Sequence, residues 1–569
     1  MAEINPVNIA IVGFGPKGFY ALERLLASIC SFEITRTVKI HVFNSSNSYA
    51  AGDVYNTHQA EYLIMNFPNH KIDIWNRQQP PYIVKEALNF TSWLAKYRPK
   101  TLKSFYAPRK IVGEYLIDGY KQLKKSIPSN IEIIEIEDVV TAIDIENDAL
   151  RITTKNHGVF DTLFFSIMCT TGHLGAGASF NENAKTATEV PFVYPLNEKL
   201  DHLSKEKMIG IQGLGLTFID TLLYLTEGQG GKFSCENDAL IYQPSENFKT
   251  KIYAFSRTGI PSVPRVPNED RKKTPKYFTI ENISTKKPIN FEKQLLPLIK
   301  QEYCYNYYQT LFNIYDWELK FYTDFKKVET QIDSFHKEFP SENRFSWNLV
   351  ENPYNGTEVN HQTFLALCRF FIDECEKGIT NSAYLNALGT WRSISNLFNE
   401  IYSFGGLDGE SHKLFDSYYF NLFNRTSYGP PLSNFKKMYA IASTGLLDLT
   451  FGANPTVEKS TESFLLSKGQ KETRIDYLIN ARIPRKSCRE NTMFESLIEN
   501  NIGREFINED YRTGTIHIDN IGKVVNSKNI NIFLYGTPTE GITFDNDTLN
   551  TTRNNFASTW ANALCKTLR

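Results

Sequence analysis

Paired cysteines are missing from this chain. Its eight cysteines are spread over 569 residues, and no two of them have the Cys-x-x-Cys spacing. They stand at Cys30, Cys169, Cys235, Cys304, Cys368, Cys375, Cys488 and Cys565. This pattern argues against a disulfide scaffold, a zinc ribbon and a dithiol redox relay. We therefore expect thiols that stay reduced and no metal site.

An excess of charge of one sign and a long apolar run are missing as well. The 62 lysines and arginines balance the 63 aspartates and glutamates, so no overall field favours nucleic acid or an anionic membrane. No segment reaches the roughly 18 apolar residues that a membrane-spanning helix needs. A strand pattern begins at residue 8, which leaves no room for a signal peptide. We expect a soluble, cytoplasmic protein with neither a nucleic-acid nor a membrane partner; the sequence does not indicate its oligomeric state.

What the chain does contain, over residues 8–25, is a strand, a glycine-rich turn and a helix. The apolar run 9–12 predicts a buried strand, and apolar residues from Phe19 to Ile29 recur with helical spacing. The GxGxxG turn between them lets backbone approach a pyrophosphate, which the helix N-terminus faces. The motif alone also fits a plain strand-to-helix turn or another nucleotide fold, but its flanks favour a dinucleotide. The predicted contacts in this turn are Gly13, Gly15, Pro16, Lys17 and Gly18.

The next predicted strand, residues 38–43, ends without the expected acid. In units of this kind an acidic residue usually accepts both hydroxyls of the ribose. Here the position holds Asn44, whose amide oxygen can accept a hydrogen bond but carries no charge. We expect Asn44 to contact the ribose with help from Ser45, Ser46 or backbone, and Asn44→Asp to tighten cofactor retention.

A second strand, glycine turn and helix begin at residue 208. Gly213 and Gly215 repeat the first turn 200 residues later, and Thr217 opens the helix, but Phe218 replaces the third glycine. The helix must therefore lie further from the strand, or the ring must fill the groove between them. Two such units in one chain predict tandem dinucleotide binding.

The strand after the second turn, residues 252–255, ends in Ser256 and Arg257. This is where the ribose of the second nucleotide is recognised, and an arginine with no acid beside it suits a 2′-phosphate. The position favours NADPH over NADH, with NADH as the alternative. A plain surface arginine is the other interpretation.

Helical patterns dominate residues 285–450, and strand patterns return after them. The helical region carries ten aromatic residues between positions 303 and 325, which packing explains better than a stacking pocket. Arg369, Arg392 and Arg425 are candidates for binding a substrate carboxylate, although solvated arginines on helix faces are the commoner case. Strand patterns at 475–483, 515–518 and 531–535 precede a glycine turn at 536–541 and a terminal helix. The order predicts an α/β fold of two Rossmann-like domains, the first interrupted by the second, plus a mostly helical insert.

Several of these segments resemble a family of bacterial FAD/NAD(P)-binding proteins related to flavin-dependent N-hydroxylating monooxygenases. The matching segments are VGFGPKGFYALERL (12–25), AAGDVYN (50–56), YLIMN (62–66), APRKIVGEYL (107–116), TTGH (170–173), GLGLTFID (213–220), SRTGIP (256–261) and GTPTEG (536–541). The resemblance implies two domains of the glutathione-reductase type, with FAD on the first and NAD(P)H on the second. The implied division is 1–204 for the first part of the FAD domain, 205–284 for the NAD(P)H domain, 285–450 for a helical substrate or cap region and 451–569 for the returning part of the FAD domain.

The resemblance also implies the remaining site residues. Asn66 corresponds to an asparagine beside the flavin ring and is the predicted catalytic residue, in contact with NADP⁺ and with a C4a-hydroperoxyflavin. An asparagine that caps the turn before Pro68 is the structural alternative. His173 is a candidate functional residue, but a loop histidine satisfied by backbone is the commoner case. The further cofactor contacts that the resemblance implies are Gly52, Val54, Tyr55, Arg109, Thr171, Gly172, Gly536, Thr539, Glu540 and Gly541.

The expected reaction follows from the resemblance. NADPH reduces FAD, the reduced flavin takes up oxygen, and the hydroperoxide oxygenates the nitrogen of an amine or amino acid. Characterised family members act on amino acids, aspartate among them. The alternatives are an FAD-dependent NAD(P)H reductase or diaphorase with another electron acceptor, and a flavin- or nucleotide-binding module without turnover. The sequence does not identify the substrate.

Overall fold

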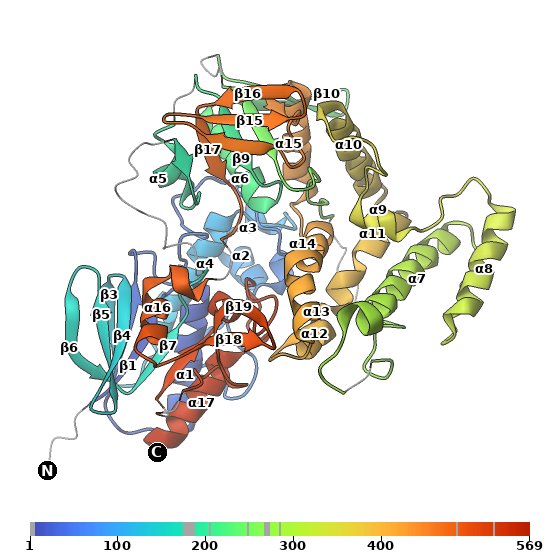
Figure 1. The fold of residues 1–569 in the computed structure, drawn as a ribbon. Helices are drawn as coiled ribbons and strands as arrows, with labels where there is room; N and C mark the ends of the chain where they lie inside the picture. The colour runs from blue at the N-terminus through green and yellow to red at the C-terminus, as the bar shows by residue number, and fades with distance from the viewer. Residues whose placement is uncertain are drawn as a thin grey trace, which may run out of the picture. The chain divides into compact units, whose positions relative to one another are not determined.

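The computed structural model describes residues 6–173, 188–203, 206–246, 250–266, 273–283, 286–484, 487–526, 528 and 530–569. The chain divides into two compact units (Figure 1). The first contains Met1–Asn181, Tyr402–Gly405 and Pro484–Arg569, and the second contains Glu182–Ile401 and Gly406–Ile483. The chain therefore makes a long excursion into the second unit, which is interrupted only at Tyr402–Gly405, and returns to the first unit at Pro484.

A five-stranded parallel sheet forms the centre of the first unit. Its order is β20-β7-β1-β2-β3, and every neighbouring pair is parallel. The strands are β1 (Val7–Val12), β2 (Val38–Asn44), β3 (Ile131–Glu137), β7 (Ser166–Cys169) and β20 (Ile532–Leu534). β1 lies at the middle of the sheet and is almost wholly buried, as its run of β-branched residues predicts.

Helices cover this sheet, and smaller sheets flank it. α1 (Pro16–Ser31) packs beside α17 (Phe556–Leu568), so most of α1 is buried rather than only one face. The other helical elements are α2 (Phe90–Tyr97), α3 (Pro99–Leu102), α4 (Arg109–Lys124), α16 (Thr492–Glu499), η1 (Asn69–Lys71), η6 (Cys488–Glu490) and η7 (Thr537–Thr539). The flanking antiparallel strands are β4 (Val140–Glu146), β5 (Ala149–Thr154) and β6 (Gly158–Phe164), and the pair β18 (Glu505–Asn508) and β19 (Tyr511–Ile516).

The second unit is built on its own five-stranded parallel sheet, of order β13-β12-β9-β17-β8. The strands are β8 (Glu189–Val190), β9 (Ile209–Gln212), β12 (Ile252–Phe255), β13 (Leu447–Asp448) and β17 (Tyr477–Asn480). α6 (Leu216–Leu225) follows β9, and the short helices α5 (Leu196–Leu200) and η3 (Glu227–Gln229) lie on either side of it in sequence. The antiparallel strands are β10 (Lys232–Glu236), β11 (Ala239–Gln243), β14 (Thr456–Lys459), β15 (Phe464–Lys468) and β16 (Lys471–Ile475).

The helical segment of the second unit runs from residue 291 to 443. Its helices are η4 (Phe291–Leu295), α7 (Leu296–Ile314), α8 (Phe325–Glu338), α9 (Trp347–Glu351), α10 (His361–Lys377), α11 (Ala383–Leu388), α12 (Thr390–Tyr402), α13 (Gly409–Leu414), η5 (Phe415–Tyr419), α14 (Phe420–Ser427) and α15 (Leu432–Ser443). Aromatic rings pack against one another here: the ring of Phe312 stacks on that of Phe335 with centroids 4.6 Å apart. This agrees with the packing interpretation of the aromatic stripe.

The sheets and the helical segment confirm the predicted α/β fold class, but one boundary differs from the prediction. The sequence predicts that the strand pattern at 475–483 belongs to the returning part of the first domain, which begins at residue 451. In the structure β17 pairs in parallel with β9, from Tyr477 opposite Ile209 to Asn480 opposite Gln212, within the second unit. A short buried strand carries no mark in its sequence of which sheet it joins.

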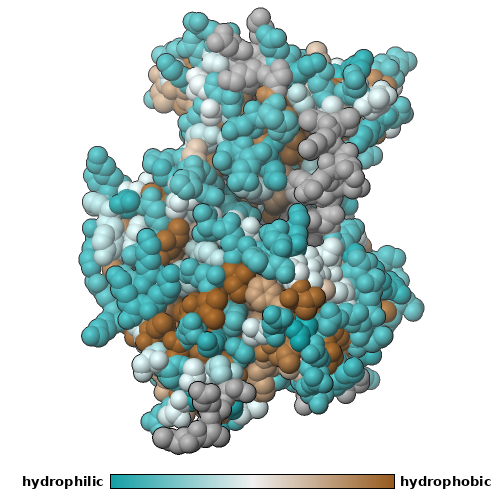
Figure 2. All heavy atoms as spheres, turned by 90° about the vertical axis from the view of Figure 1, so that its left-hand side faces the viewer, coloured by the Kyte–Doolittle hydropathy of each residue, from teal (hydrophilic) through white to brown (hydrophobic). Residues whose placement is uncertain are grey.

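Three further observations concern the described part of the chain only. No helix there combines the length and the apolar character that crossing a bilayer would require. No group of three or more histidine, cysteine or acidic side chains is placed to hold a metal ion. On the face drawn in Figure 2, apolar side chains gather in a band over the first unit.

Candidate cofactor and active site

The three glycines of the first turn have separate structural duties. Gly13 has a φ of 86°, and a Cβ at this position would lie 2.6 Å from the Cα of Thr171. A Cβ on Gly18 would collide with the carbonyl oxygen of Gly13. A Cβ on Gly15 would have only the Cα of Gly52 near it, at 3.9 Å. Gly13 and Gly18 are therefore needed by the fold, whereas Gly15 borders open space.

The N-terminus of α1 also fits a phosphate group. Gly15 is the N-cap residue, no described side chain caps the helix, and Pro16 occupies the first turn. Main-chain N–H groups at such an end attract an anion, and the helix dipole adds to the attraction. The free N–H groups and the small second glycine therefore suit the pyrophosphate of FAD at this turn.

Three buried hydroxyls around this turn lack a hydrogen-bond partner among the described residues. They are the side chains of Thr171, Tyr535 and Thr537. Thr171 follows β7 and the other two follow β20, so all three lie beyond the carboxyl ends of strands in the same sheet. A buried hydroxyl without a partner is costly, and polar groups of a bound FAD would satisfy these hydroxyls. Thr171 is a predicted contact; the sequence analysis did not single out Tyr535 or Thr537.

Asn44 is occupied by the turn itself. Its side-chain oxygen accepts a hydrogen bond of 2.9 Å from the backbone N–H of Phe14. Its amide group donates to the carbonyl of Ser46 at 2.7 Å. The side chain is 7% exposed, so its main structural effect is to tie the glycine turn to the end of β2. A contact of Asn44 with the ribose, through the second lone pair of its side-chain oxygen, remains a prediction.

The segment with Asn66 lies beside the start of α4. Backbone hydrogen bonds of 2.8 Å run from Met65 to Ala107 and from Arg109 to Leu63, and Ile64 forms a bridge with Pro108. Because the bridge is antiparallel, Asn66 is level with Tyr106 and the buried Arg109 is level with Leu63, so the two residues lie at opposite ends of this pairing. The turn after Pro68 is held by another asparagine, Asn69, whose oxygen accepts from the backbone of Ala107 at 2.8 Å.

The predicted segment from Gly52 to Tyr55 packs on α4. Gly52 adopts a φ of 62° beside Gly15, while Val54 is 37% exposed. A Cβ on Gly113 of α4 would collide with the carbonyl oxygen of Tyr55. Burial raises the pKa of Tyr55 to about 12, against the opposing effect of the Arg109 charge, so the phenol stays protonated at neutral pH.

The charged groups around Lys17 form a cluster that the sequence revealed only in part. The ammonium group of Lys17 donates to the carbonyl of Asn550 at 3.0 Å and lies 4.9 Å from the ring centroid of Tyr535. Burial lowers the pKa of Lys17 to about 7. The carboxylate of Asp547 acts in the opposite sense, and it also acts on the half-buried His173, whose pKa is lowered by desolvation. Asp547 thus faces two basic groups next to the glycine turn.

Asp547 and Asn550 were missed because no motif marks them. The only signal is their place in an Asn- and Asp-rich loop that follows GTPTEG, which is typical of a surface turn. Tertiary folding brings the loop back over the first glycine turn, 530 residues away in sequence.

The GTPTEG segment mostly holds its own loop together. A Cβ on Gly536, whose φ is 80°, would lie 2.9 Å from Lys17 Cγ. The hydroxyl of Thr539 donates to the Gly536 carbonyl at 2.8 Å. The carboxylate of Glu540 accepts from the side chain of Asn546 at 2.8 Å, and Gly541 adopts a φ of 106°. Gly172, after β7, also has a positive φ and open space beside it.

The second unit has its own glycine turn with the same geometry at its first two glycines. Gly213 has a φ of 123°, and its Cβ would lie 2.7 Å from the carbonyl oxygen of Ala481. Gly215 caps α6 and faces open space, with Ser262 Oγ nearest at 3.9 Å. Thr217 is buried, and Phe218 is fully buried at the position of the missing third glycine. The ring is thus packed inside the unit. This is one of the two outcomes that the sequence predicts for Phe218.

The residues after β12 differ in their surroundings. The hydroxyl of Ser256 accepts from the backbone of Gly259 at 2.9 Å, so it stabilises the turn. The guanidinium of Arg257 is exposed and reaches the carbonyl of Ser417 only at 3.4 Å. Arg257 is therefore free to meet a phosphate, as NADPH binding requires.

The three arginines of the helical segment make contacts within it. Arg369 is solvated and pairs with Asp373 at 2.7 Å. Arg392 donates to the carbonyl of Ser427 at 2.8 Å. Arg425 is half-buried and donates to the carbonyls of Val350 and Glu351 at 2.8 and 2.9 Å. The solvated interpretation holds for Arg369 and is wrong for Arg425, which joins α14 to α9.

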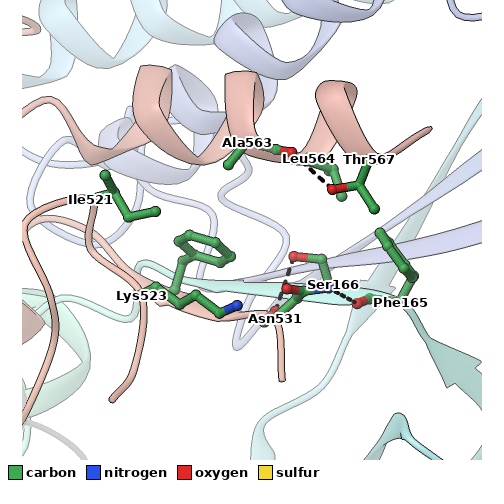
Figure 3. Close-up of a pocket in the computed structure, with 9 residues that line it drawn as sticks. Phe165, Ser166, Ile521, Lys523, Asn531, Ala563, Leu564 and Thr567 are labelled. Carbon is green, nitrogen blue, oxygen red and sulfur yellow. Dashed lines mark hydrogen bonds between the residues drawn. The ribbon is translucent and has the colours of Figure 1, made fainter. Parts of the chain in front are cut away.

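A cavity of about 120 Å³ lies at the other edge of the first sheet (Figure 3). Its lining includes Ser166, the first residue of β7, and Asn531, just before β20. The hydroxyl of Ser166 donates to the carbonyl of Asn531 at 3.0 Å and accepts from the indole of Trp560 at 3.0 Å. Because cofactors of this fold bind at the carboxyl ends of the strands, this cavity is not the FAD site.

Known proteins resemble the chain in sequence and in fold. The model of a family described as FAD-NAD(P)-binding matches residues 10–174. The nitrosuccinic acid synthase npaA of Aspergillus oryzae is 27% identical over 94% of this chain and 88% of its own. An L-aspartate N-monooxygenase (nitrosuccinate-forming) of Streptomyces davaonensis is 25% identical over 84% of this chain and 82% of its own. The fold is similar to that of the reduced form of ornithine hydroxylase (PvdA) from Pseudomonas aeruginosa, with a TM-score of 0.52, 12% identity and coverage of 99% of this chain and 100% of that one.

Proposed function

We propose, from its membership of the FAD/NAD(P)-binding proteins related to flavin-dependent N-hydroxylating monooxygenases, that this chain oxygenates the nitrogen of an amino acid with FAD, NADPH and oxygen. The observation that carries the proposal is the share of the chain that the similarity covers. The similarity to nitrosuccinate-forming enzymes covers 94% of the chain, so it includes both glycine turns and the helical segment. Each compact unit contributes one turn with an open space beside its second glycine.

The residues that would hold FAD belong to the first unit. The pyrophosphate would lie on the N–H groups at the start of α1, beside Gly15. The free hydroxyls of Thr171, Tyr535 and Thr537 would donate to polar groups of the cofactor. When FAD is bound and reduced by NADPH, it supplies the activated oxygen. The protein binds and orients the cofactor and the substrate, and it excludes water from them.

The residues that would hold NADPH belong to the second unit. Its pyrophosphate would lie at the start of α6, beside Gly215, with Arg257 at the 2′-phosphate. The roles proposed for Asn66 and Arg109 follow from the family resemblance. The amide of Asn66 would orient the reacting groups through hydrogen bonds, and the buried Arg109 would contribute a fixed positive charge. Tyr55 would donate a hydrogen bond, because its raised pKa keeps its proton in place.

L-Aspartate is the proposed first substrate to test, because two relatives are named for nitrosuccinate formation or aspartate oxidation. The proposed location is the cytoplasm, where NADPH and free amino acids are available. The experiment measures NADPH oxidation by the FAD-loaded enzyme with each amino acid, together with the product mass. Succinate, which has the carboxylates of aspartate but no amine, is the matched control.

We expect aspartate or a similar amino acid to stimulate NADPH oxidation and to gain oxygen on nitrogen, while succinate gains none. Stimulation without an oxygenated product, with all electrons recovered in hydrogen peroxide or in an added quinone, would contradict the proposal. It would instead favour a reductase or diaphorase.

A further inference from the structure

Two arginines flank the second glycine turn at matching positions. β12 and β17 lie on opposite sides of β9, with Phe255 and Asn480 both paired with Gln212 at the end of that strand. Arg257 and Arg482 each stand two residues beyond these partners. Since neighbouring strands lie about 4.8 Å apart, the two backbones are about 10 Å apart at this edge. Arginine side chains can cover such a span from both sides.

Arg482 lies directly against the turn. A Cβ on Gly213 would come within 3.2 Å of its Cγ atom, so the stem of the arginine packs on the first residue of the turn. Its Nε atom donates to the side-chain oxygen of Asn480 at 2.8 Å, which leaves the two terminal amino groups of the guanidinium to bind elsewhere. This bond fixes the orientation of the guanidinium without neutralising its charge.

The two positive charges act on each other. Burial is the larger cause of a lowered pKa of Arg482, and the nearby charge of Arg257 lowers it further. Two like charges held at one sheet edge are unfavourable until an anion binds between them or to each of them. Together with the matching positions of the two arginines and the packing of Arg482 on Gly213, this points to an anion site larger than the one that Arg257 alone would make.

The first unit supports a cofactor role for this position. Cys169 pairs with Val12 at the end of β1, as Asn480 pairs with Gln212 at the end of β9. By this register Arg482 corresponds to Thr171, whose buried hydroxyl has no partner among the described residues. The two units thus place a polar side chain at the same point beside their glycine turns.

Resting on the proposed function, we propose that Arg482 binds the pyrophosphate of the nicotinamide nucleotide, while Arg257 binds only the 2′-phosphate. The division follows from position. The glycine turn after β9 receives the pyrophosphate, and the strand next to it in the β12 direction receives the adenosine ribose. Arg482 packs on that turn, and Arg257 stands at the ribose position. Arg482 would therefore strengthen binding of NADPH and NADH alike, and Arg257 would create the preference for NADPH.

The experiment measures the Kd of NADP⁺ and of NAD⁺ by calorimetry on the FAD-loaded wild type and its variants. Arg482→Gln is expected to raise both constants by a similar factor, about tenfold, because a charge-assisted contact is lost. Arg257→Gln is expected to raise the Kd of NADP⁺ about tenfold and to leave that of NAD⁺ unchanged. Arg474→Gln is the control, since Arg474 lies on β16 and bonds to Ser463 at 2.7 Å.

A Kd ratio of NADP⁺ to NAD⁺ that shifts in Arg482→Gln would overturn the division, because Arg482 would then contact the 2′-phosphate. Unchanged constants for both nucleotides would overturn the role of Arg482 altogether. Arg482→Lys replaces Arg482→Gln in the experiment if the latter does not fold. It keeps the charge without the planar fork, so an increase of about threefold in both constants is expected. A wild type that binds neither nucleotide would contradict the proposed function itself.

Discussion

The two glycine turns show which parts of the motif a fold needs and which a ligand needs. Gly13 and Gly213 have positive φ values and face the backbone beyond the neighbouring strand, at Thr171 and Ala481. Gly15 and Gly215 both border open space. The third position differs, since Gly18 must be small whereas the ring of Phe218 is buried. The first glycine thus serves the turn, the second serves the cofactor, and the third only sets how the helix packs.

The largest effect is expected where the two turns differ. Phe218→Ala removes a fully buried ring, and we expect the free energy of unfolding to fall by about 3–5 kcal/mol. Denaturant unfolding measures the change, and Leu216→Ala, at a half-buried position on the same helix, is the control. A loss for Phe218→Ala no larger than that of the control would mean that the ring does not support the second unit.

The shared second glycines offer a way to separate the cofactors. Gly15 and Gly215 have φ values of −81° and −97°, which alanine adopts without strain. Gly15→Ala is expected to weaken FAD binding by about tenfold to hundredfold and Gly215→Ala to weaken NADP⁺ binding by a similar factor, because a methyl group enters the space for the phosphates. Flavin absorbance and calorimetry check the two effects, with thermal unfolding as the control for folding. Loss of both cofactors in either variant would contradict the assignment of one turn to each.

Lys17 makes cofactor binding at the first turn depend on pH. The second turn has Leu216 and Thr217 at the positions of Pro16 and Lys17, so it lacks this dependence. The pKa of Lys17 is about 7 because of burial, and a bound pyrophosphate would raise it. FAD binding therefore takes up a proton, so its affinity is full below pH 7 and falls as the pH rises above it. We expect a loss of about tenfold between pH 6.5 and 8.5.

Lys17→Met is the matched variant for that titration. It keeps the length of the side chain but cannot take up a proton, so its FAD affinity should be nearly constant over the same range. A pH profile identical to that of the wild type would show that another group is responsible.

The smallest effect concerns Asn44. The sequence suggested that Asn44→Asp would tighten FAD retention, but the amide of Asn44 donates to Ser46 at 2.7 Å, and a carboxylate would repel that carbonyl. We now expect Asn44→Asp to weaken FAD binding by about fivefold, equivalent to about 1 kcal/mol. Equilibrium dialysis of FAD checks the direction, and tighter binding would restore the ribose contact as the dominant role. Thr35→Ala, at an exposed position before β2, serves as the control.

Local patterns predicted much of the fold and part of the site. The strands and helices around both glycine turns were predicted because their apolar periodicity and their glycines act over short distances along the chain. The assignment of β17 was wrong because sheet partners are chosen by tertiary packing. Asp547, Tyr535 and Arg482 were missed for the same reason: each follows a strand or loop that folding carries to a turn far away in sequence.

The sequence by itself determined that the chain builds two strand–turn–helix units with backbone geometry suited to phosphates, since that geometry depends on glycines only a few residues apart. The tertiary structure alone decided which side chains surround each turn. Charges and hydroxyls on β7, β17, β20 and the loop after residue 541 reach the turns only because parallel strands end at a common edge of the sheet.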